Sequence, residues 1–222
     1  MIVGKPKSIE DIIELTRPYP RLLIVGCGSC LTVCRTGGGR EVSIAARAIS
    51  LARQGMPGAF ETLEMIVQRQ CEPELCEDLL VVASQYDAVL SFGCAAGMQS
   101  IADMIRTIPI LPGVDTQFMG RIVDHDRFIE QCIGCGECTL DRTDGICLIT
   151  RCPKAQQNEP CGGSDSADHC EVNPDIECVW ITFSRRLGER SGSGSISEVV
   201  DPKDWSQSHA GGLRMTPADP ES

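Results

Sequence analysis

Short apolar segments alternate with segments of helical periodicity through the first half of the chain. Four apolar segments have the length of buried β-strands, and they lie at residues 21–26, 60–67, 88–92 and 108–111. Apolar residues that recur every three to four positions predict helices at residues 8–15, 41–54 and 74–84, and after a glycine turn at residue 93. Ser8 is the expected N-cap of the first helix, and the glycines at residues 37–39 are the expected entry turn of the second.

This alternation predicts an α/β fold with a small Rossmann- or flavodoxin-like parallel sheet covered by helices on both faces. Right-handed crossovers place the strand at 21–26 beside the strand at 88–92, with the strand at 60–67 on its other side. Open sheets of this kind bind ligands in the crevice beyond the carboxyl ends of the strands, where the strand order reverses. The segments that follow residues 26 and 92 are therefore the first candidates for a binding site.

The second half of the chain has few apolar residues. Residues 109–131 are interpreted as a bridge, and residues 132–178 hold eight of the fourteen cysteines. The segment VWITFSRRL (179–187) predicts a short apolar helix or strand that packs on this cysteine-rich region, while residues 191–222, rich in Gly, Ser, Pro and Asp, are expected to be a flexible tail. The predicted domains are an α/β domain (1–120), a metal-stabilised cysteine-rich module (121–190) and the tail (191–222).

The charge balance excludes some classes of partner. The chain has 31 acidic and 20 basic residues, a formal net charge of −11, which argues against a nucleic acid or an anionic membrane as partner. No segment approaches the roughly 20 apolar residues that a membrane-spanning helix needs, and the N-terminus has no signal-peptide pattern. The sequence predicts a cytoplasmic protein without membrane insertion, whose cysteines stay reduced and available to metals.

The cysteine-rich region has the pattern of a metal or cluster site. It opens with CxxCxxC, which brings three thiols onto one tight turn, and sets of four thiolates satisfy tetrahedral iron or zinc. The Cys152-Pro153 step is typical of the end of a ferredoxin-type set, whereas a disulfide scaffold fits poorly with CxxCxxC in a reducing compartment. Eight thiolates could hold [4Fe–4S] clusters alone or one cluster and one structural zinc, and the candidate ligands are Cys132, Cys135, Cys138, Cys147, Cys152, Cys161, Cys170 and Cys178.

A second group of cysteines follows the carboxyl ends of the predicted strands. Cys27, Cys30 and Cys94 are expected to share a cluster or metal site there, because the ends of neighbouring parallel strands meet at one edge of the sheet. Cys34 follows in the same loop, and Cys71 follows the strand at 60–67. Either of these two residues could supply the fourth thiolate, and the sequence leaves that choice open.

Two other interpretations of this region stay open. Gly26-x-Gly28 could begin a dinucleotide-binding loop, although Leu31 stands where the third glycine of that motif belongs. The cysteines could also be buried residues that bind nothing. Cys76, which falls in a predicted helix, is interpreted as an ordinary core or surface residue.

Several segments together resemble a known family. They are GCGSCLTVCRTGGG from residue 26, CAAGMQS from residue 94 and CIGCGECTLDRTDGICLITRCPKAQQNEPCGG from residue 132. In these segments the chain is similar to the MetV-type small, cysteine-rich subunits of the methylenetetrahydrofolate reductases of acetogens and related anaerobes, and to a methylenetetrahydrofolate reductase C-terminal domain. The resemblance covers about residues 21–187 and points to the same cysteines in both halves.

The resemblance implies an electron-transfer subunit that is not itself catalytic. One or two [4Fe–4S] clusters, with zinc as a further metal, would pass electrons to a separate flavin-bearing reductase subunit in the methyl branch of one-carbon metabolism, the Wood–Ljungdahl pathway. A further electron-donating subunit or a ferredoxin is the implied source of the electrons. The alternative function is a zinc-stabilised scaffold that organises an enzyme complex without redox work.

Overall fold

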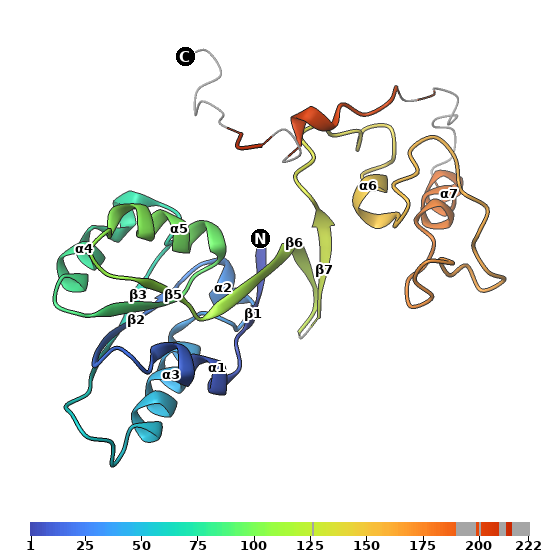
Figure 1. The fold of residues 1–222 in the computed structure, drawn as a ribbon. Helices are drawn as coiled ribbons and strands as arrows, with labels where there is room; N and C mark the ends of the chain where they lie inside the picture. Colours follow the sequence, from blue (N-terminus) through green and yellow to red (C-terminus); the bar gives the residue numbers. More distant parts are fainter. Residues whose placement is uncertain (126, 190–198, 200, 209–211, 215–222) are drawn as a thin grey trace, which may run out of the picture. The chain divides into compact units, whose positions relative to one another are not determined.

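The computed structural model describes residues 1–125, 127–189, 199, 201–208 and 212–214 (Figure 1). The chain divides into two compact units, Met1–Met119 and Gly120–Ser222. No described helix combines the length and the apolar character that crossing a membrane requires.

A four-stranded parallel sheet forms the centre of the first unit. Its strands are β2 (Arg21–Cys27), β3 (Glu61–Val67), β4 (Ala88–Phe92) and β5 (Ile110–Pro112), in the order β3-β2-β4-β5. All three pairings are parallel. The predicted central position of the strand at 21–26 is confirmed. The fourth strand begins later than predicted and includes Pro112, because an edge strand tolerates a residue without an N–H donor.

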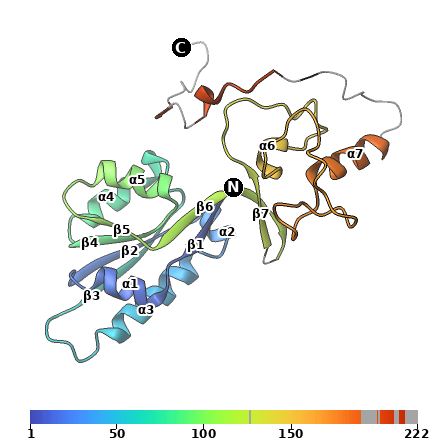
Figure 2. The ribbon, with the colours of Figure 1, turned by 45° about the vertical axis from the view of Figure 1, so that its right-hand side comes forward.

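Helices cover both faces of this sheet (Figure 2). Helices α1 (Ile9–Thr16) and α3 (Gly39–Ala52) share one core cluster, and α4 (Glu77–Ala83) and α5 (Ala95–Met104) share the other. Strand β2 serves both clusters because its side chains alternate, with Leu22 and Ile24 in the first and Leu23 and Val25 in the second, all fully buried. The α/β architecture predicted from the alternation is therefore confirmed.

The local signals at two helix starts are also confirmed. The Ser8 hydroxyl accepts a hydrogen bond from the Asp11 N–H at 3.0 Å and caps α1. Helix α3 begins directly after Gly38, whose N–H donates to the Glu41 carboxylate at 3.0 Å. Two short helices lie in the loops, α2 (Cys30–Val33) after β2 and the 3-10 helix η1 (Pro73–Cys76) before α4.

An antiparallel sheet replaces the predicted bridge at 109–131. Strand β6 (Val114–Asp124) pairs with β1 (Ile2–Pro6) through residues 114–119 and continues to pair with β7 (Arg127–Cys132), in the order β1-β6-β7. The segment contains the boundary between the two units, but its strands were not predicted, because β6 and β7 are mostly exposed and so show no apolar alternation. A bulge between Val3 and Gly4 further disturbs the pattern.

The second unit contains little regular structure. Beyond the β6–β7 region it has α6 (Leu148–Arg151), α7 (Val179–Glu189) and a 3-10 turn, η2 (Trp205–Gln207), among the described residues. Helix α7 corresponds to the predicted apolar helix or strand at 179–187. Its Trp180 and Phe183 rings meet edge to face at 5.8 Å between centroids. The core cluster of this unit consists of Ile146, Leu148, Cys152, Val179, Trp180 and Phe183.

Candidate metal centres

The cysteines of the first unit lie where the carboxyl ends of the strands meet. Cys27 is the last residue of β2, and Cys94 follows β4 as the N-cap of α5. Cys71 lies between β3 and η1, and Cys30 begins α2. Cys27 and Cys94 are buried in the same core cluster, and Cys30 packs against that cluster. The segment that joins Cys30 to α3 is fixed by Gly37, where a Cβ atom would lie 2.0 Å from the Phe92 carbonyl oxygen.

Cys71 interacts electrostatically with two of these thiols. Burial raises the pKa of Cys71, and the neighbouring Cys94 and Cys27 raise it further. Burial also raises the pKa of Cys76, and the neighbouring Cys27 and Cys71 raise it further. The Cys76 thiol is fully buried and donates to the backbone carbonyl of Glu72 at 3.5 Å. Cys76 is therefore a core residue beside the group rather than a member of its exposed edge.

The Cys34 thiol contacts β1, although Cys34 also lies close enough to Cys30 for the two thiols to interact electrostatically. Its thiol donates to the carbonyl oxygen of Ile2 in β1 at 3.3 Å, and only 6% of the residue is exposed. Burial raises the pKa of Cys34, so the thiolate is disfavoured in this position. Between the two residues that the sequence left open, the structure brings Cys71 and not Cys34 next to Cys27 and Cys94.

The CxxCxxC segment of the second unit is a turn with backbone N–H groups near sulfur. The Gly134 N–H donates to the Cys132 sulfur at 3.3 Å, and Gly134 and Gly136 both have positive φ, 65° and 87°. Further along, Cys147 caps α6, where its sulfur accepts from the Thr150 N–H at 3.5 Å. Such N–H···S contacts stabilise negative charge on sulfur, and the glycines permit the backbone geometry that provides them.

Part of the predicted tail packs on this turn. Lys203 donates from Nζ to the carbonyl oxygen of Glu137 at 3.4 Å and pairs with its carboxylate at 3.2 Å. The Lys203 side chain is only 2% exposed, and a Cβ atom on Gly136 would lie 2.3 Å from the Gln207 carbonyl oxygen. Residues 201–208 thus contact this turn through Lys203 and Gln207, although most of them are exposed. Most of the segment predicted to be a flexible tail, at residues 191–198, 200, 209–211 and 215–222, lies outside the described residues.

Four other cysteines line one small cavity. Cys152, Cys161, Cys170 and Cys178 surround about 20 Å³, together with residues that include Arg151, Lys154 and Trp180. A space of this size holds about one water-sized group. The indole Nε1 of Trp180 is buried and, among the described side chains, is the one buried nitrogen or oxygen that has no hydrogen-bond partner. An unpaired buried N–H is costly, and here it belongs to a residue of the cavity wall.

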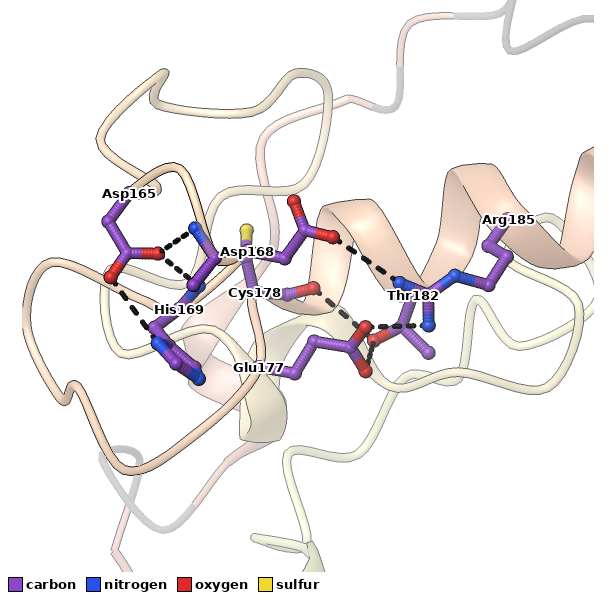
Figure 3. Close-up of polar contacts among 8 residues, drawn as sticks. Asp165, Asp168, His169, Glu177, Cys178, Thr182 and Arg185 are labelled. Carbon is purple, nitrogen blue, oxygen red and sulfur yellow. Dashed lines mark hydrogen bonds and ion pairs between the residues drawn. The ribbon is translucent and has the colours of Figure 1, made fainter.

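Hydrogen bonds fix the loops that carry Cys170 and Cys178 (Figure 3). The Cys178 N–H donates to the Asp168 carbonyl oxygen at 2.7 Å, and Asp165 accepts from the His169 N–H at 2.8 Å. At the start of α7, Arg185 pairs with Glu177 at 2.7 Å. The exposed His169 ring faces Asp165 at 3.3 Å, and His169 is not among the residues that line the cavity.

Positive charge lies beside this cavity. The Lys154 side chain donates a hydrogen bond to the Glu171 carboxylate. This hydrogen bond raises the pKa of Lys154 and lowers the pKa of Glu171. The Cys161 sulfur lies 3.7 Å from the Glu171 carboxylate. A thiolate at Cys161 would repel Glu171 and attract Lys154, so these cysteines have a nearby cation that can balance their charge.

Among the residues that the structure describes, no three His, Cys, Asp or Glu side chains are gathered closely enough to hold one metal ion. The cysteines are neighbours along loop edges and cavity walls rather than closed sets of ligands. The sequence identified these cysteines and predicted that the segment with Trp180 packs on the cysteine-rich region, but it gave no sign of Gln70 and Lys203. These two residues carry no signal in the sequence, since each matters through tertiary contacts.

Comparisons with known proteins bear on the second unit. Neither the curated proteins nor the solved structures that were searched contain a match to the chain. The family model described as methylene-tetrahydrofolate reductase C terminal matches residues 111–206, which include β6, β7, the cysteine-rich loops and α7. This match agrees with the resemblance noted in the sequence, and residues 111–206 are similar to the methylene-tetrahydrofolate reductase C-terminal family.

Proposed function

We propose that the chain is the iron–sulfur electron-transfer subunit of a methylenetetrahydrofolate reductase complex and delivers electrons to a flavin-bearing partner subunit. The observation that carries this proposal is the grouping of thiols at three places, the carboxyl edge of the parallel sheet, the CxxCxxC turn and the four-cysteine cavity. The similarity of residues 111–206 to the reductase-related family supports the metabolic context.

The sheet edge of the first unit has a donor set that fits a [4Fe–4S] cluster. The proposed ligands are Cys27, Cys30, Cys71 and Cys94, since Cys34 donates to a backbone carbonyl elsewhere. The thiolates of such a cluster bind four different irons, so their sulfurs stand further apart than those around a single ion. The buried apolar residues behind Cys27 and Cys94 exclude water on one side, and the exposed Cys71 leaves the other side open to an electron donor or acceptor.

The CxxCxxC turn is the proposed second cluster site. Cys132, Cys135, Cys138 and Cys147 are its ligands in this proposal, and the N–H···S contacts from Gly134 and Thr150 would stabilise bound thiolates. Lys203, held against the Glu137 backbone, adds a buried positive charge close to this turn. A cation near a cluster stabilises its reduced, more negative form and so raises its potential.

We assign a single zinc ion, rather than a cluster, to the four-cysteine cavity, whose described side chains would have to draw together to bind it. Its volume of about 20 Å³ suits one ion, and Cys152, Cys161, Cys170 and Cys178 complete a four-thiolate set. Trp180, whose buried indole N–H is unpaired, is one of the residues that line this cavity, and a metal-bound thiolate would be a suitable acceptor for that N–H. In this assignment Cys152 belongs with the later cysteines, not with CxxCxxC.

Reduction of methylenetetrahydrofolate to methyltetrahydrofolate takes two electrons and two protons. Bound clusters supply one-electron carriers, and the chain's own residues hold them, exclude water from them and set the charge around them. The proton chemistry and folate binding belong to the flavin-bearing partner. A further subunit or a ferredoxin supplies the electrons.

A second candidate function is a zinc-stabilised scaffold without redox work. The small size of the four-cysteine cavity favours it, because that cavity alone would explain a structural ion. The two functions differ at the sheet edge and at the CxxCxxC turn, which would hold iron in the electron-transfer subunit and no iron in the scaffold.

Metal analysis of the anaerobically purified full chain tests the proposal. We expect about eight irons, matching acid-labile sulfide and about one zinc per chain, as three four-thiolate sites require. Cys138→Ser should lower iron and leave zinc, and Cys170→Ser should do the reverse. A colourless chain with zinc alone would favour the scaffold.

Electron delivery is tested in the complex with the flavin-bearing subunit. Cys94→Ser should leave that complex assembled and abolish reduction of its flavin by the physiological or a ferredoxin-like donor. Cys76→Ala is the matched control, because Cys76 is a buried cysteine of the same region whose thiol donates to backbone carbonyls. Unchanged donor-driven reduction in Cys94→Ser would contradict the proposed route.

A further inference from the structure

Gln70 is a fully buried polar side chain at the carboxyl edge of the parallel sheet. Its Nε2 donates to the carbonyl oxygens of Val25 and Gly26 at the end of β2, both at 3.1 Å. Its Oε1 accepts from the Ser91 hydroxyl in β4 at 2.7 Å. One amide therefore joins the exits of β2 and β4 to the loop that follows β3.

The same network continues into the loop that begins α5. The Ser91 hydroxyl oxygen accepts a hydrogen bond from the Gly93 N–H at 3.1 Å. A Cβ atom on Gly93 would lie 2.1 Å from the Gln70 Oε1, and one on Gly97 would lie 2.8 Å from the Gln70 Cβ. The two glycines let the Gln70 side chain pack directly on the backbone that carries Cys94.

Each segment tied to this amide contains a cysteine at the next position. Gly26 precedes Cys27, Gln70 itself precedes Cys71, and Gly93 precedes Cys94. Three thiols from three separate loops thus share one buried attachment point. The amide of the residue before Cys71 thus contacts the residues before Cys27 and Cys94.

We propose that Gln70 is the positioning residue of the thiol group at the sheet edge, and that its amide fixes the relative placement of Cys27, Cys71 and Cys94. The proposal rests on the cluster-binding function proposed above. A cluster requires thiolates held at set separations, and loops without a common attachment would hold them less closely. Glutamine suits the position because its amide supplies two donors and an acceptor at once, whereas ionised Glu lacks the donors and Leu lacks both.

The test uses the full chain in two states and three variants. Gln70→Leu has a similar volume and removes all three hydrogen bonds of the amide. Ser91→Ala removes the hydrogen bonds of Ser91 with Gln70 and with Gly93, and it keeps the two that Gln70 Nε2 donates to β2. Thr16→Val is the matched control. Thr16 is also fully buried, but its hydroxyl donates to the Ile12 carbonyl at 2.8 Å within α1, among residues that include no cysteine.

The first measurement needs no metal. Metal-free chain is treated with diamide, which takes two electrons and two protons from a pair of thiols, and disulfides among Cys27, Cys71 and Cys94 are identified by peptide mapping. We expect Gln70→Leu to slow this cross-linking by about tenfold or more, because a buried hydrogen-bond network that fixes the loops is lost. Ser91→Ala should slow only the pairs that include Cys94, and Thr16→Val should cross-link like the unchanged chain.

The second measurement uses the iron-loaded chain. Gln70→Leu should lose or broaden the electron paramagnetic resonance signal of the sheet-edge cluster and retain the signal of the CxxCxxC cluster, with the far-ultraviolet circular dichroism of a folded chain. Unchanged cross-linking in both Gln70→Leu and Ser91→Ala, or equal loss in Thr16→Val, would overturn the positioning role. An unchanged chain that binds no iron yet shows the cross-linking pattern would overturn the proposed function and leave the positioning role standing.

Discussion

The two units hold their cysteines by different means. In the first unit, Cys27 and Cys94 extend from strands whose apolar residues are buried between two helical layers. In the second, the cysteines lie on loops around a core cluster of six buried residues, one of which is itself Cys152. In the first unit, the buried apolar core holds the segments that carry the cysteines in place. The second unit buries too few apolar side chains to hold its cysteines in the same way.

This difference predicts different roles for a metal. At the sheet edge, a cluster would bind to loops that the sheet and Gln70 have already placed. In the cysteine-rich loops, binding free energy would also be folding free energy, as it is in small metal-dependent domains. A bound metal would therefore add to a first unit that is already folded, whereas the second unit would need its metal in order to fold.

Metal removal should produce the largest separation between the units. A chelator should unfold the cysteine-rich loops, since a structural zinc contributes about 10 kcal/mol or more in small domains, and should leave the parallel sheet intact. Limited proteolysis with mass spectrometry measures this, with cuts expected after residue 132 and protection before residue 119. Simultaneous loss of protection in both units would show that the difference drawn here is false.

Truncation of a core side chain gives the next largest effect. Phe183→Ala should destabilise the second unit by about 3–5 kcal/mol, which its small core cannot offset, and should release the zinc. Ile49→Ala is the counterpart in the larger core of the first unit, where a cost of about 2–5 kcal/mol should lower the unfolding midpoint and leave zinc bound. Zinc content and denaturant unfolding of both variants provide the measurement.

The first unit was largely predictable from its sequence. Its strands are apolar segments bounded by turns, and Ser8 and Gly38 mark helix starts, so periodicity and capping chemistry identify the elements and right-handed crossovers give their order. Strands β6 and β7 were missed because exposed strands carry no burial pattern. The pattern of apolar and polar residues along the sequence indicates which side chains are buried, so it does not indicate strands that bury few side chains.

The candidate sites were predictable in composition but not in grouping. Spacing identified the cysteines, yet it linked Cys152 with CxxCxxC because of the following Pro153, whereas the structure places it in the cavity with Cys178. It also left Cys34 and Cys71 equivalent, and only a tertiary contact to Ile2 separates them. Grouping depends on how loops pack, which spacing along the chain does not encode.

Removal of the unpaired indole N–H should have a moderate effect that is confined to the second unit. Trp180→Phe keeps an aromatic ring against Phe183 and removes the unpaired donor together with part of the ring volume. If that N–H donates to a metal-bound thiolate, zinc affinity should fall by about tenfold, since hydrogen bonds to charged groups contribute about 1.5–3 kcal/mol. Competition with a chromogenic chelator measures it. Unchanged affinity in a folded variant would contradict the donor role.

The smallest effect should come from the edge of the sheet opposite to the cysteines. There, the Arg21 guanidinium donates to the Asp87 carboxylate at 2.6 Å and holds the pKa of Asp87 below its ordinary value of 3.8. A group whose pKa is lowered on folding stabilises the protein above that ordinary value, and this contribution is lost as pH falls through the folded pKa.

Asp87→Asn should therefore unfold at a slightly lower urea concentration than the unchanged chain at pH 7, and the difference should shrink below about pH 4. Diamide cross-linking of Cys71 and Cys94 should not change, because the ion pair joins only the starts of β2 and β4. A urea difference that persists unchanged to pH 2 would show that Asp87 acts through its shape and not its charge.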